Sequence, residues 1–340
     1  MKLESCSSNS QIKYSFEWWK PIEESLSGIN IDGIKVTCPK CNKKGFAVTR
    51  WIKGPSLKPI FILHIKNTRV KKVCEINKTQ SERIREKVSV QERDIKSLLK
   101  KRKAFVLFSG GKDSLATLAY LKSLSNGTGK NITAIYVDTT AGLPENTVYI
   151  KKVCRYLKVK LKIVRPRVDY FTLVKKWGIP SFGYRWCCRE LKIKPIEEYL
   201  NTIREPKVVF DGIRAVESRI RKQYIPIWYH PSFKCLSVSP LFYWSDQEVI
   251  SYINSNGIPK TMLHSLGSST ECWCGAYKTE SDFRNLYNLN KDMFKKLARV
   301  EKENKNRYTF LYKKGRKIPL ESLEKQILIE RKRTTAENHL

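Results

Sequence analysis

The sequence predicts an α/β protein whose main domain is a parallel, doubly wound sheet, flanked by a small zinc-ribbon-like module and a basic helical C-terminal region. Three observations support this fold class. Short apolar runs alternate with helix-like patterns through the middle of the chain, which is typical of strands joined by crossover helices. A C-x-x-C pair precedes this part of the chain, and a basic segment without cysteine follows it.

The net charge predicts an anionic partner. Lys and Arg number 66 against 32 Asp and Glu, which gives a formal charge of +34 on 340 residues. A nucleotide, RNA or DNA would account for this excess, and so would a solvated basic surface with no such partner.

Hydropathy and cysteine usage indicate a cytoplasmic protein. The N-terminal residues lack the apolar core of a signal peptide, and apolar runs such as 59–63 are too short to span a bilayer, so no membrane contact is expected. Ten cysteines in a reducing compartment favour metal binding or catalysis over disulfides.

The first cysteine pair predicts a metal-stabilised module. Residues 1–33 are an N-terminal extension with an aromatic patch at 16–19, and residues 34–76 contain strand-like runs at 46–52 and 60–65. A segment of this size buries too small a core to fold without a cross-link such as a bound metal ion. Three thiolates and one imidazole can bind zinc in tetrahedral geometry. A free pair of thiols on a loop is the alternative. The candidate zinc ligands are Cys38, Cys41, His64 and Cys74.

The remaining elements follow from local patterns. Residues 77–103 are charged with a thin apolar stripe, which predicts one linker helix before the main domain of residues 104–275. The tail of residues 276–340 is basic and helical, with a hairpin turn at 313–317. Capping boxes pair Ser245 with Glu248 and Thr279 with Asp282. The expected strands of the main domain are 104–108, 132–137, 161–164, 208–211 and 236–238.

The loop after the first strand of the main domain predicts a phosphate site. Two glycines allow a tight turn, and a helix begins at once, so its free N–H groups and positive dipole end face the loop. The spacing is neither that of a Walker A loop nor that of a Rossmann fingerprint. A strand-to-helix turn without a ligand is the alternative. The loop residues are Ser109, Gly110, Gly111, Lys112, Asp113 and Ser114.

This SGGKDS loop resembles the pyrophosphate loop of the PP-loop superfamily, which includes ATP pyrophosphatases and phosphoadenosine phosphosulfate (PAPS) reductases. Three further stretches resemble PAPS reductases in the order of the family. They are DTTAGLPE from Asp138, with Thr140 in place of the usual glycine, DGIRAVESR from Asp211 to Arg219, and PLFYWSDQEV from Pro240. The resemblance covers roughly residues 104–275 and implies an adenine nucleotide alpha hydrolase-like fold.

The resemblance also implies site residues. Nucleotide contacts are expected from the loop and from Asp138, Arg214, Glu217 and Ser218, and catalytic roles from Lys112, Asp113, Arg214 and Arg219. Asp138 can bind a ribose or help to hold a magnesium ion, or it can cap the helix that begins at Pro144. The expected ligand is ATP, adenylyl sulfate (APS) or PAPS.

A second cysteine set resembles that of iron–sulfur sulfonucleotide reductases. Arginines and lysines surround the tandem pair, and the later pair is C-x-C where the family has C-x-x-C. Four thiolates can hold a [4Fe–4S] cluster or zinc, and two inert thiols in a basic loop are the alternative. The residues are Cys187, Cys188, Cys272 and Cys274.

Three functions remain open at this point. The first is reduction of APS or PAPS by a sulfonucleotide reductase-like enzyme, with a thiol or redox protein as reductant. The second is adenylation and thiolation of a substrate such as tRNA or DNA by an ATP pyrophosphatase. The third is a non-catalytic nucleic-acid-binding protein. The tandem cysteines and the motif from Arg214 to Arg219 favour the first function, which is the primary prediction. SGGKDS, the charge of +34 and a tail without the C-terminal cysteine that the reductases use favour the second. The sequence indicates no oligomeric state.

Overall fold

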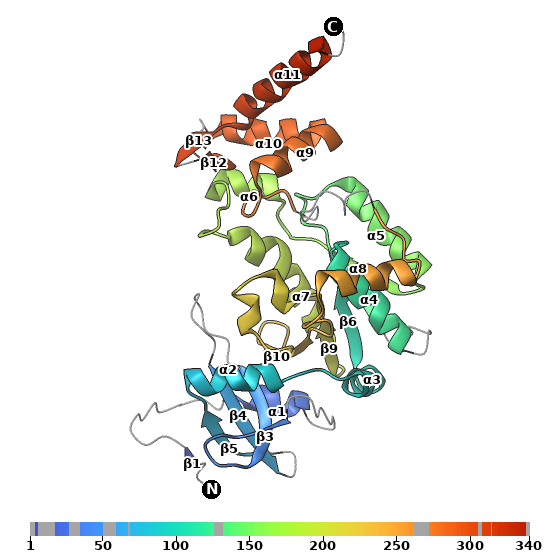
Figure 1. Cartoon of the computed structure of the whole chain (residues 1–340), viewed down its shortest axis with the longest axis vertical. Coiled ribbons are helices and arrows are strands. Elements are labelled where there is room, and N and C mark those ends of the chain that lie inside the picture. Colours follow the sequence, from blue (N-terminus) through green and yellow to red (C-terminus); the bar gives the residue numbers. More distant parts are fainter. Residues whose placement is uncertain are drawn as a thin grey trace. The chain divides into compact units, whose positions relative to one another are not determined.

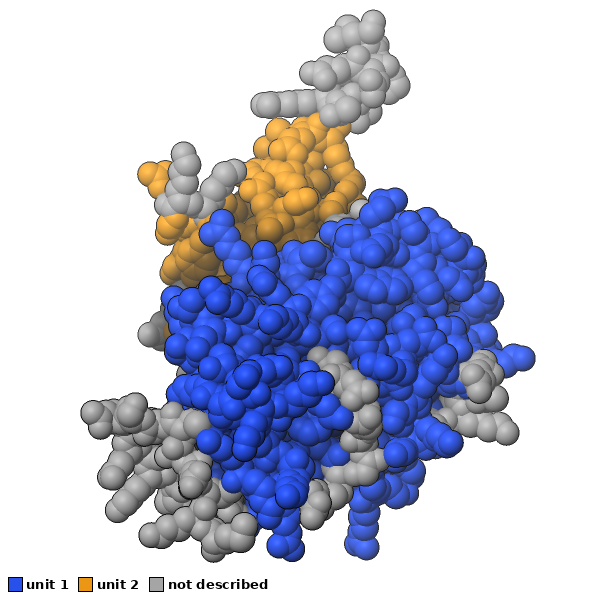
Figure 2. All heavy atoms as spheres, turned by 60° about the horizontal axis from the view of Figure 1, so that its bottom comes forward, with its two compact units in different colours: residues 1–136, 152–162, 199–259 blue, residues 137–151, 163–198, 260–340 orange. Residues whose placement is uncertain are grey.

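A computed structural model of the chain describes residues 4–5, 18–26, 35–49, 59–66, 69–125, 132–261, 272–304, 308–313 and 315–337. It divides into two compact units that exchange the chain several times. Unit 1 comprises residues 1–136, 152–162 and 199–259, and unit 2 comprises residues 137–151, 163–198 and 260–340 (Figure 2). The expected SGGKDS loop belongs to unit 1, and the second cysteine set belongs to unit 2.

Unit 1 begins with a five-stranded sheet of order β1-β5-β4-β3-β2 (Figure 1). All its pairings are antiparallel except that of β1 with β5. Apolar side chains of β4 such as Ile60 and Ile62 are fully buried, and Trp18 packs on Phe61 with ring centroids 4.8 Å apart. The elements are β1 (Glu4–Ser5), α1 (Lys20–Leu26), β2 (Lys35–Thr37), β3 (Lys44–Thr49), β4 (Ile60–Lys66) and β5 (Arg69–Glu75).

Two helices, α2 (Lys78–Lys87) and α3 (Glu92–Lys101), occupy the charged segment where one linker helix was expected. The first ends because Val88 adopts an extended conformation. A new helix then starts with a capping box between Gln91 and Asp94, in which Gln stands at the position where Ser or Thr is more common.

The main sheet of six strands is mostly parallel, with order β10-β11-β9-β6-β7-β8. All five strands expected from the sequence are confirmed within one residue. The inner strands are buried almost throughout, as a sheet covered on both faces requires. The five expected strands are β6 (Lys103–Leu107), β7 (Ile132–Val137), β8 (Lys160–Val164), β9 (Lys207–Phe210) and β11 (Cys235–Val238). Of these, β8 lies at an edge of the sheet, and only Val164 in it is buried.

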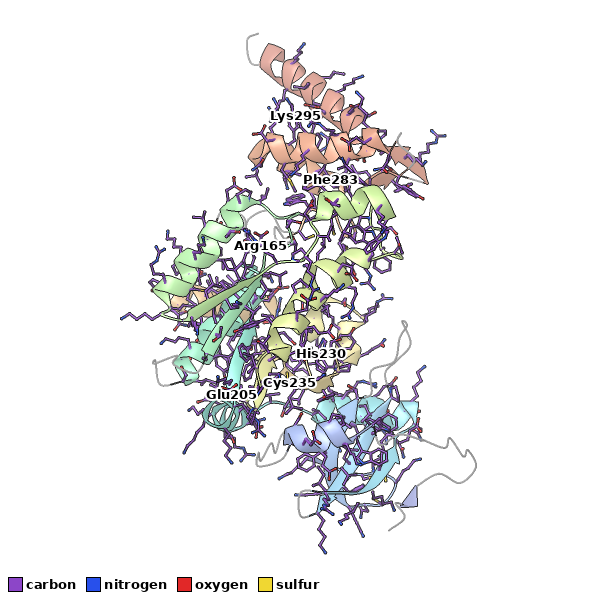
Figure 3. All side chains as sticks on the ribbon, turned by 180° about the vertical axis from the view of Figure 1, so that it is seen from behind. Arg165, Glu205, His230, Cys235, Phe283 and Lys295 are labelled. Atoms are coloured by element: carbon purple, nitrogen blue, oxygen red, sulfur yellow. The ribbon has the colours of Figure 1, made fainter. Side chains whose placement is uncertain are left out.

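The sixth strand, β10 (Ile227–His230), was not expected. It runs antiparallel to β11 at the edge of the sheet, and His230 pairs with Cys235 (Figure 3). Pro226 and Pro231 flank this strand. Because proline cannot donate a hydrogen bond within a sheet, its presence indicates a strand only at the edge of a sheet.

Helices and short turns connect these strands. The capping box of Ser245 and Glu248 is confirmed at the start of α8. No helix among the described residues is long and apolar enough to cross a membrane. The connecting elements are α4 (Lys112–Leu124), α5 (Pro144–Tyr156), α6 (Tyr170–Trp177), a π-helix (Cys188–Ile193), α7 (Lys194–Asn201), 3-10 turns at Ala215–Glu217 and Arg221–Gln223, and α8 (Asp246–Ser255).

The C-terminal part of unit 2 is helical, as expected. Its helices pack on α6 around Phe283 (Figure 3) and Phe294, both fully buried. The capping box of Thr279 and Asp282 and the hairpin around Gly315 are both confirmed. The elements are α9 (Glu280–Leu289), α10 (Lys291–Glu303), β12 (Leu311–Lys313), β13 (Arg316–Ile318) and α11 (Leu320–Glu337).

A buried carboxylate connects three of these elements. Glu301 of α10 is 1% exposed and accepts hydrogen bonds from the backbone N–H groups of Phe310 (2.7 Å) and Leu320 (2.6 Å). Burial raises the pKa of Glu301 from 4.5 to about 7, and the two N–H donors oppose this shift.

The stability of unit 2 should therefore depend on pH through Glu301. Because its pKa is higher in the folded than in the unfolded chain, the folded state binds more protons between pH 4.5 and 7, and stability is lost as pH rises through this window. The loss is on the order of 3 kcal/mol. Glu301→Gln should flatten this dependence in thermal unfolding at pH 5 and pH 8. Glu303→Gln is the control, since Glu303 forms only a partly exposed ion pair with Lys175.

Candidate functional site

The SGGKDS loop leaves β6 and turns directly into α4. Gly110 has a φ of 87°, in the left-handed region that favours glycine, and Gly111 is the N-cap of α4. The hydroxyls of Ser109 and Ser114 lie 3.2 Å apart, and Ser114 Oγ donates to the carbonyl of Gly111 (2.9 Å). These hydrogen bonds between loop residues stabilise the turn. The first backbone N–H groups of α4, which have no partner within the helix, lie where the loop meets the helix.

A buried arginine ties the loop to two other segments. Arg214 is 1% exposed and donates from Nε to Asp113 Oδ1 (2.8 Å), from Nη1 to the carbonyl of Trp244 (3.0 Å) and from Nη2 to Asp246 Oδ1 (2.7 Å). Burial alone would lower the pKa of Arg214, but the two carboxylates raise it, so the charge is secure. Arg214 was expected to contact the nucleotide, but in this structure its guanidinium donates these hydrogen bonds to groups of the protein itself.

Lys112 is the more accessible cation of this network. Its side chain is 38% exposed, and its Nζ contacts Asp246 Oδ1 and lies 3.4 Å from Asp113 Oδ1. Hydrogen bonds from Lys112 and Arg214 lower the pKa of Asp246 to about 2. Asp246 is a site residue that sequence reasoning missed. Its signal was its position as the first residue of α8, directly after the Ser245 cap.

The end of β9 approaches the start of α4 so closely that only glycine fits. A Cβ on Gly212 would lie 2.8 Å from the backbone nitrogen of Ser114 and 2.9 Å from the carbonyl carbon of Asp113. The preceding Asp211 is buried and accepts hydrogen bonds from Ser237 Oγ (2.8 Å) and Ser239 Oγ (2.6 Å). Burial raises the pKa of Asp211, and these hydroxyl donors limit the shift.

Two of the other expected residues, Glu217 and Ser218, form local contacts in the same segment. Glu217 accepts from the backbone N–H of Arg214 (2.8 Å) and pairs with Arg221. Ser218 Oγ accepts from the backbone N–H of Arg221 (3.1 Å), and Arg219 is exposed. Glu217 therefore caps this turn rather than orienting the side chain of Arg214.

Asp138 lies at the end of β7, in unit 2. It pairs with Arg165 (Figure 3), whose Nη2 is 2.7 Å from Asp138 Oδ2, and accepts from the backbone N–H of Thr140 (3.1 Å). Thr140 has a φ of 61°, which is uncommon and strained for a β-branched residue. Its hydroxyl compensates by donating to the carbonyl of Thr139 (2.6 Å) and accepting from the N–H of Tyr170 (2.7 Å).

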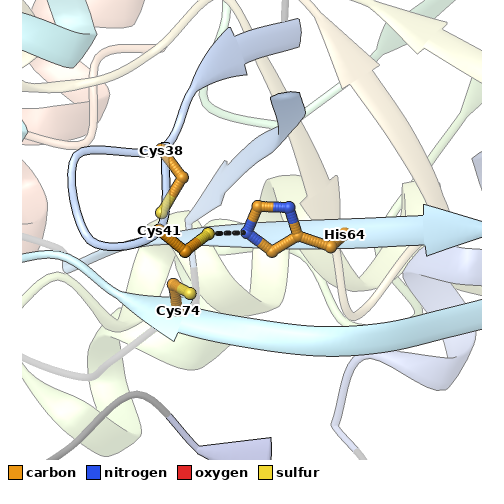
Figure 4. Close-up of side chains that lie close together, drawn as sticks. All are labelled: Cys38, Cys41, His64 and Cys74. Carbon is orange, nitrogen blue, oxygen red and sulfur yellow. Dashed lines mark hydrogen bonds between the residues drawn. The ribbon is translucent and has the colours of Figure 1, made fainter. Parts of the chain in front are cut away.

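The first cysteine set is gathered at one end of the N-terminal sheet (Figure 4). The ligand atoms of Cys38, Cys41, His64 and Cys74 all lie within 4.8 Å of one another. His64 Nε2 is 3.3 Å from Cys41 Sγ, and its Nδ1 is 3.1 Å from the carbonyl oxygen of Lys44. A hydrogen bond at the other ring nitrogen is what orients an imidazole that binds a metal. This Cys3His group fits a metal ion.

The second cysteine set assembles within unit 2 from two segments far apart in sequence. All four thiols are free, and Cys187 Sγ donates a hydrogen bond of 3.4 Å to Cys274 Sγ. Cys188 shares a hydrogen bond with Cys187, and Cys272 shares one with Cys274. Hydrogen bonds from the thiols of Cys187 and Cys272 lower the pKa of Cys274 to about 3. The hydrogen bond from Cys187 lowers the pKa of Cys188 to about 7. The π-helix begins at Cys188, and such turns are frequent at functional sites.

Buried aromatic rings support the cysteine segments. Trp186 stacks on Tyr170 at 6.0 Å, and Tyr170 Oη donates to the carbonyl of Cys274 (3.2 Å). The turn after Cys274 requires Gly275, whose φ is 93° and whose Cβ would lie 2.4 Å from the ring of Phe310. The two segments are therefore held together by packing as well as by their thiols.

Comparison with known proteins identifies one domain. Residues 103–286 match the phosphoadenosine phosphosulfate reductase domain. An uncharacterized protein of Methanocaldococcus jannaschii is 33% identical over 170 residues, 49% of this chain and 34% of that protein. An adenosine 5′-phosphosulfate reductase of Staphylococcus epidermidis is 28% identical over 134 residues, 38% of this chain and 54% of that protein. The chain thus spans only about a third to a half of these relatives.

Two solved structures are similar in part. Phosphoadenylyl-sulfate reductase from Candida auris, in a phosphate complex, aligns with a TM-score of 0.44 at 18% identity over 58% of this chain and 96% of that chain. FMN adenylyltransferase from Candida glabrata aligns with a TM-score of 0.38 at 18% identity over 50% of this chain and 54% of that chain.

The contact between β9 and α4 generates a first test of the loop. Gly212→Ala should destabilise unit 1 by about 1–3 kcal/mol, because the new methyl group meets backbone atoms that cannot rotate away. Thermal unfolding of the full chain measures this change. In the control Gly183→Ala the methyl group meets nothing within 4 Å. Equal melting temperatures for Gly212→Ala and the wild type would contradict the close approach.

The Cys3His group generates a second test. Elemental analysis of the purified full chain should find zinc that Cys38→Ser and Cys74→Ser each reduce by one equivalent, because either change removes a thiolate ligand. Cys154→Ala is the matched control, a buried cysteine outside both sets. Zinc content that is the same in all four proteins would refute this site.

Proposed function

Because the chain belongs to the phosphoadenosine phosphosulfate reductase domain family, we propose that it binds an adenine nucleotide on the SGGKDS loop and acts at the α-phosphate. The observation that carries this proposal is the mouth of the loop, where the N-terminus of α4 and the half-exposed Lys112 face outward while Arg214 is buried. An anion is the natural ligand of such a helix end.

The loop would bind the phosphates of the nucleotide. The first N–H groups of α4 donate to phosphate oxygens, and the dipole of the helix favours their charge. Lys112 adds one mobile cation, which exchanges Asp246 for a phosphate oxygen. Magnesium, if it accompanies the nucleotide, supplies further charge neutralisation, and we assign no described residue to it beyond the candidate Asp138.

The distribution of cysteines favours adenylation over sulfonucleotide reduction. Reduction needs a thiolate that attacks sulfur, and every described cysteine belongs to one of the two sets except Cys154 and Cys235. Both of these are buried, and burial raises the pKa of each thiol to about 12. Among the described residues, no cysteine outside the sets is thus suited to be the nucleophile.

The proposed reaction is an adenylyl transfer. A nucleophilic atom of the acceptor attacks the α-phosphorus of ATP, the bond between the α-phosphorus and the bridging oxygen to the β-phosphate breaks, and pyrophosphate leaves with both electrons of that bond. The N-terminus of α4 and Lys112 stabilise the leaving pyrophosphate in place. Sulfur insertion would follow when a hydrosulfide ion attacks the activated carbon of the acceptor, and AMP leaves with the electron pair of the carbon–oxygen bond that breaks.

Sulfonucleotide reduction is the second candidate. The four-cysteine set supports it, since Cys187, Cys188, Cys272 and Cys274 could hold a [4Fe–4S] cluster or zinc. Relatives named adenosine 5′-phosphosulfate reductase support it too. This candidate requires the attacking thiol to come from a separate thiol or redox-protein reductant, or from a thiol of the set itself. We propose zinc for the Cys3His group, in a structural role.

Nucleotide binding tests the proposal. Lys112→Ala should weaken ATP binding by about 1.5–3 kcal/mol, roughly 10- to 150-fold, because a charge-assisted contact to phosphate is lost. Isothermal titration of the full chain with ATP measures this. Lys100→Ala, an exposed lysine of α3 in the same unit, should bind like the wild type. If Lys112→Ala also binds ATP like the wild type, the loop is not the phosphate site.

Product analysis separates the two candidates. Anaerobic protein is incubated with ATP, APS or PAPS together with a dithiol, and pyrophosphate and sulfite are measured. We expect pyrophosphate from ATP, at a rate that Lys112→Ala lowers, and no sulfite. Sulfite release from APS or PAPS would replace adenylation with the reductase, and tight binding without either product would point to a non-catalytic nucleotide-binding protein.

A further inference from the structure

Unit 2 carries an exposed group of aromatic rings around one arginine, which neither the nucleotide loop nor the two cysteine sets use. Phe182, Tyr184 and Tyr277 are 67%, 55% and 56% exposed, and Arg185 is exposed among them. We call these four residues the aromatic–arginine patch. Large exposed rings gathered at one place are uncommon on a protein surface and mark binding sites more often than single exposed residues do.

The patch is ordered before any ligand binds. The guanidinium of Arg185 lies over the rings of Phe182 (5.6 Å) and Tyr277 (5.5 Å), and the two rings meet edge to face at 5.8 Å. Arg185 also donates to Tyr277 Oη. Ser181 and Tyr184 close the loop with reciprocal backbone hydrogen bonds of 3.2 and 3.1 Å. The rings are therefore held in place by contacts that leave their outer faces open.

The patch rests on the rigid part of unit 2. Trp186, directly after Arg185, is buried and donates to the carbonyl of Gly178 (3.1 Å). Tyr277 follows the required Gly275 by two residues in the segment of the second cysteine set. A ring presented from such a frame loses little conformational freedom when a flat ligand stacks on it.

The surrounding charge is positive. Arg189, Lys192 and Lys194 follow in the same segment, and Lys278 follows Tyr277. Each of these four already has a partner within the protein. Arg189 pairs with Glu197, Lys194 pairs with Glu190, and Lys278 Nζ lies 4.2 Å from the ring centroid of Trp273. Arg185 itself makes no ion pair among the described residues, because its guanidinium contacts two rings and a hydroxyl. Stacking surfaces beside such cations match a ligand that is both flat and anionic.

We propose that the aromatic–arginine patch binds single-stranded nucleic acid, with an unpaired base stacked on Phe182 or Tyr277 and a neighbouring phosphate on Arg185. Unpaired bases expose both faces to aromatic side chains, whereas the bases of a duplex are covered by their neighbours. The formal charge of +34 over the chain adds a long-range attraction for the same ligand. The proposal goes beyond the proposed function, since this ligand is a polymer and the patch needs no nucleotide at the loop.

Equilibrium binding of labelled oligonucleotides to the full chain tests the proposal. Fluorescence anisotropy is followed with a single-stranded RNA, a single-stranded DNA of the same sequence and the corresponding duplex, each at several salt concentrations. The proteins are the wild type, Phe182→Ala, Tyr277→Ala, Phe182→Trp and Arg185→Ala. Tyr156→Ala is the matched control, because Tyr156 is 54% exposed on α5 in unit 1. ATP is left out, so that failure here would not bear on the nucleotide loop.

Stacking predicts a specific pattern. Phe182→Ala and Tyr277→Ala should weaken single-strand binding by about fivefold or more with an unchanged salt slope, since a lost ring removes no charge. Phe182→Trp should bind at least as tightly as the wild type, and Tyr156→Ala should bind equally. Arg185→Ala should weaken binding and reduce the salt slope by about one ion. The RNA and DNA strands, compared directly, tell which sugar is preferred.

Three results would overturn the proposal. One is a wild type that binds neither single strand. Another is a duplex bound as tightly as the strands, with the ring variants unchanged, because charge alone would then account for binding. The third is equal weakening in Phe182→Ala and Phe182→Trp, which would show that the loop rather than the ring matters. Circular dichroism and melting temperatures of each variant separate this last result from misfolding.

Discussion

The hydrogen bonds of Arg214 are the constraint on which the candidate nucleotide site depends. One buried guanidinium holds Asp113 of the loop, the carbonyl of Trp244 and Asp246 of α8, so three segments of unit 1 meet at a single side chain. A buried charge is costly unless its partners stay in place, and removing one partner of such a pair typically costs about 3–5 kcal/mol. The loop is therefore fixed in shape before a nucleotide arrives.

Because of this constraint, the two cations of the site, Arg214 and Lys112, have different roles. Arg214 is 1% exposed and committed to carboxylates, whereas Lys112 is 38% exposed and bound to the mostly exposed Asp246. The buried cation organises the site, and the accessible one can reach a ligand. Asp246 contacts both, so it links the shape of the loop to the position of Lys112. Gly212 completes the arrangement by allowing β9 to touch the backbone of α4.

Much of this was predictable from sequence, because periodicity, glycines and cysteine spacing are local signals. The five parallel strands, the loop and the capping boxes follow from such signals. The partners of Arg214 and the role of Asp246 do not, because they depend on residues 30 to 101 positions apart. The contact of the Glu217 carboxylate with the backbone N–H of Arg214 is local, and it too was read only from the structure. The same limit applied to β10, which gains strand structure only by pairing at an edge, and to Thr140, whose hydroxyl bonds offset a strained backbone.

The central claim is that the start of α4 binds the phosphates of an adenine nucleotide. Hydrogen–deuterium exchange of the full chain with and without ATP tests it most directly. The exchange rates are those of the same backbone N–H groups that are proposed to bind the phosphates. We expect slower exchange in peptides that cover Ser109 to Leu115, and no change in peptides of β4 in the N-terminal sheet. Exchange at the loop that ATP leaves unaltered, under conditions where ATP is bound elsewhere on the chain, would contradict the claim.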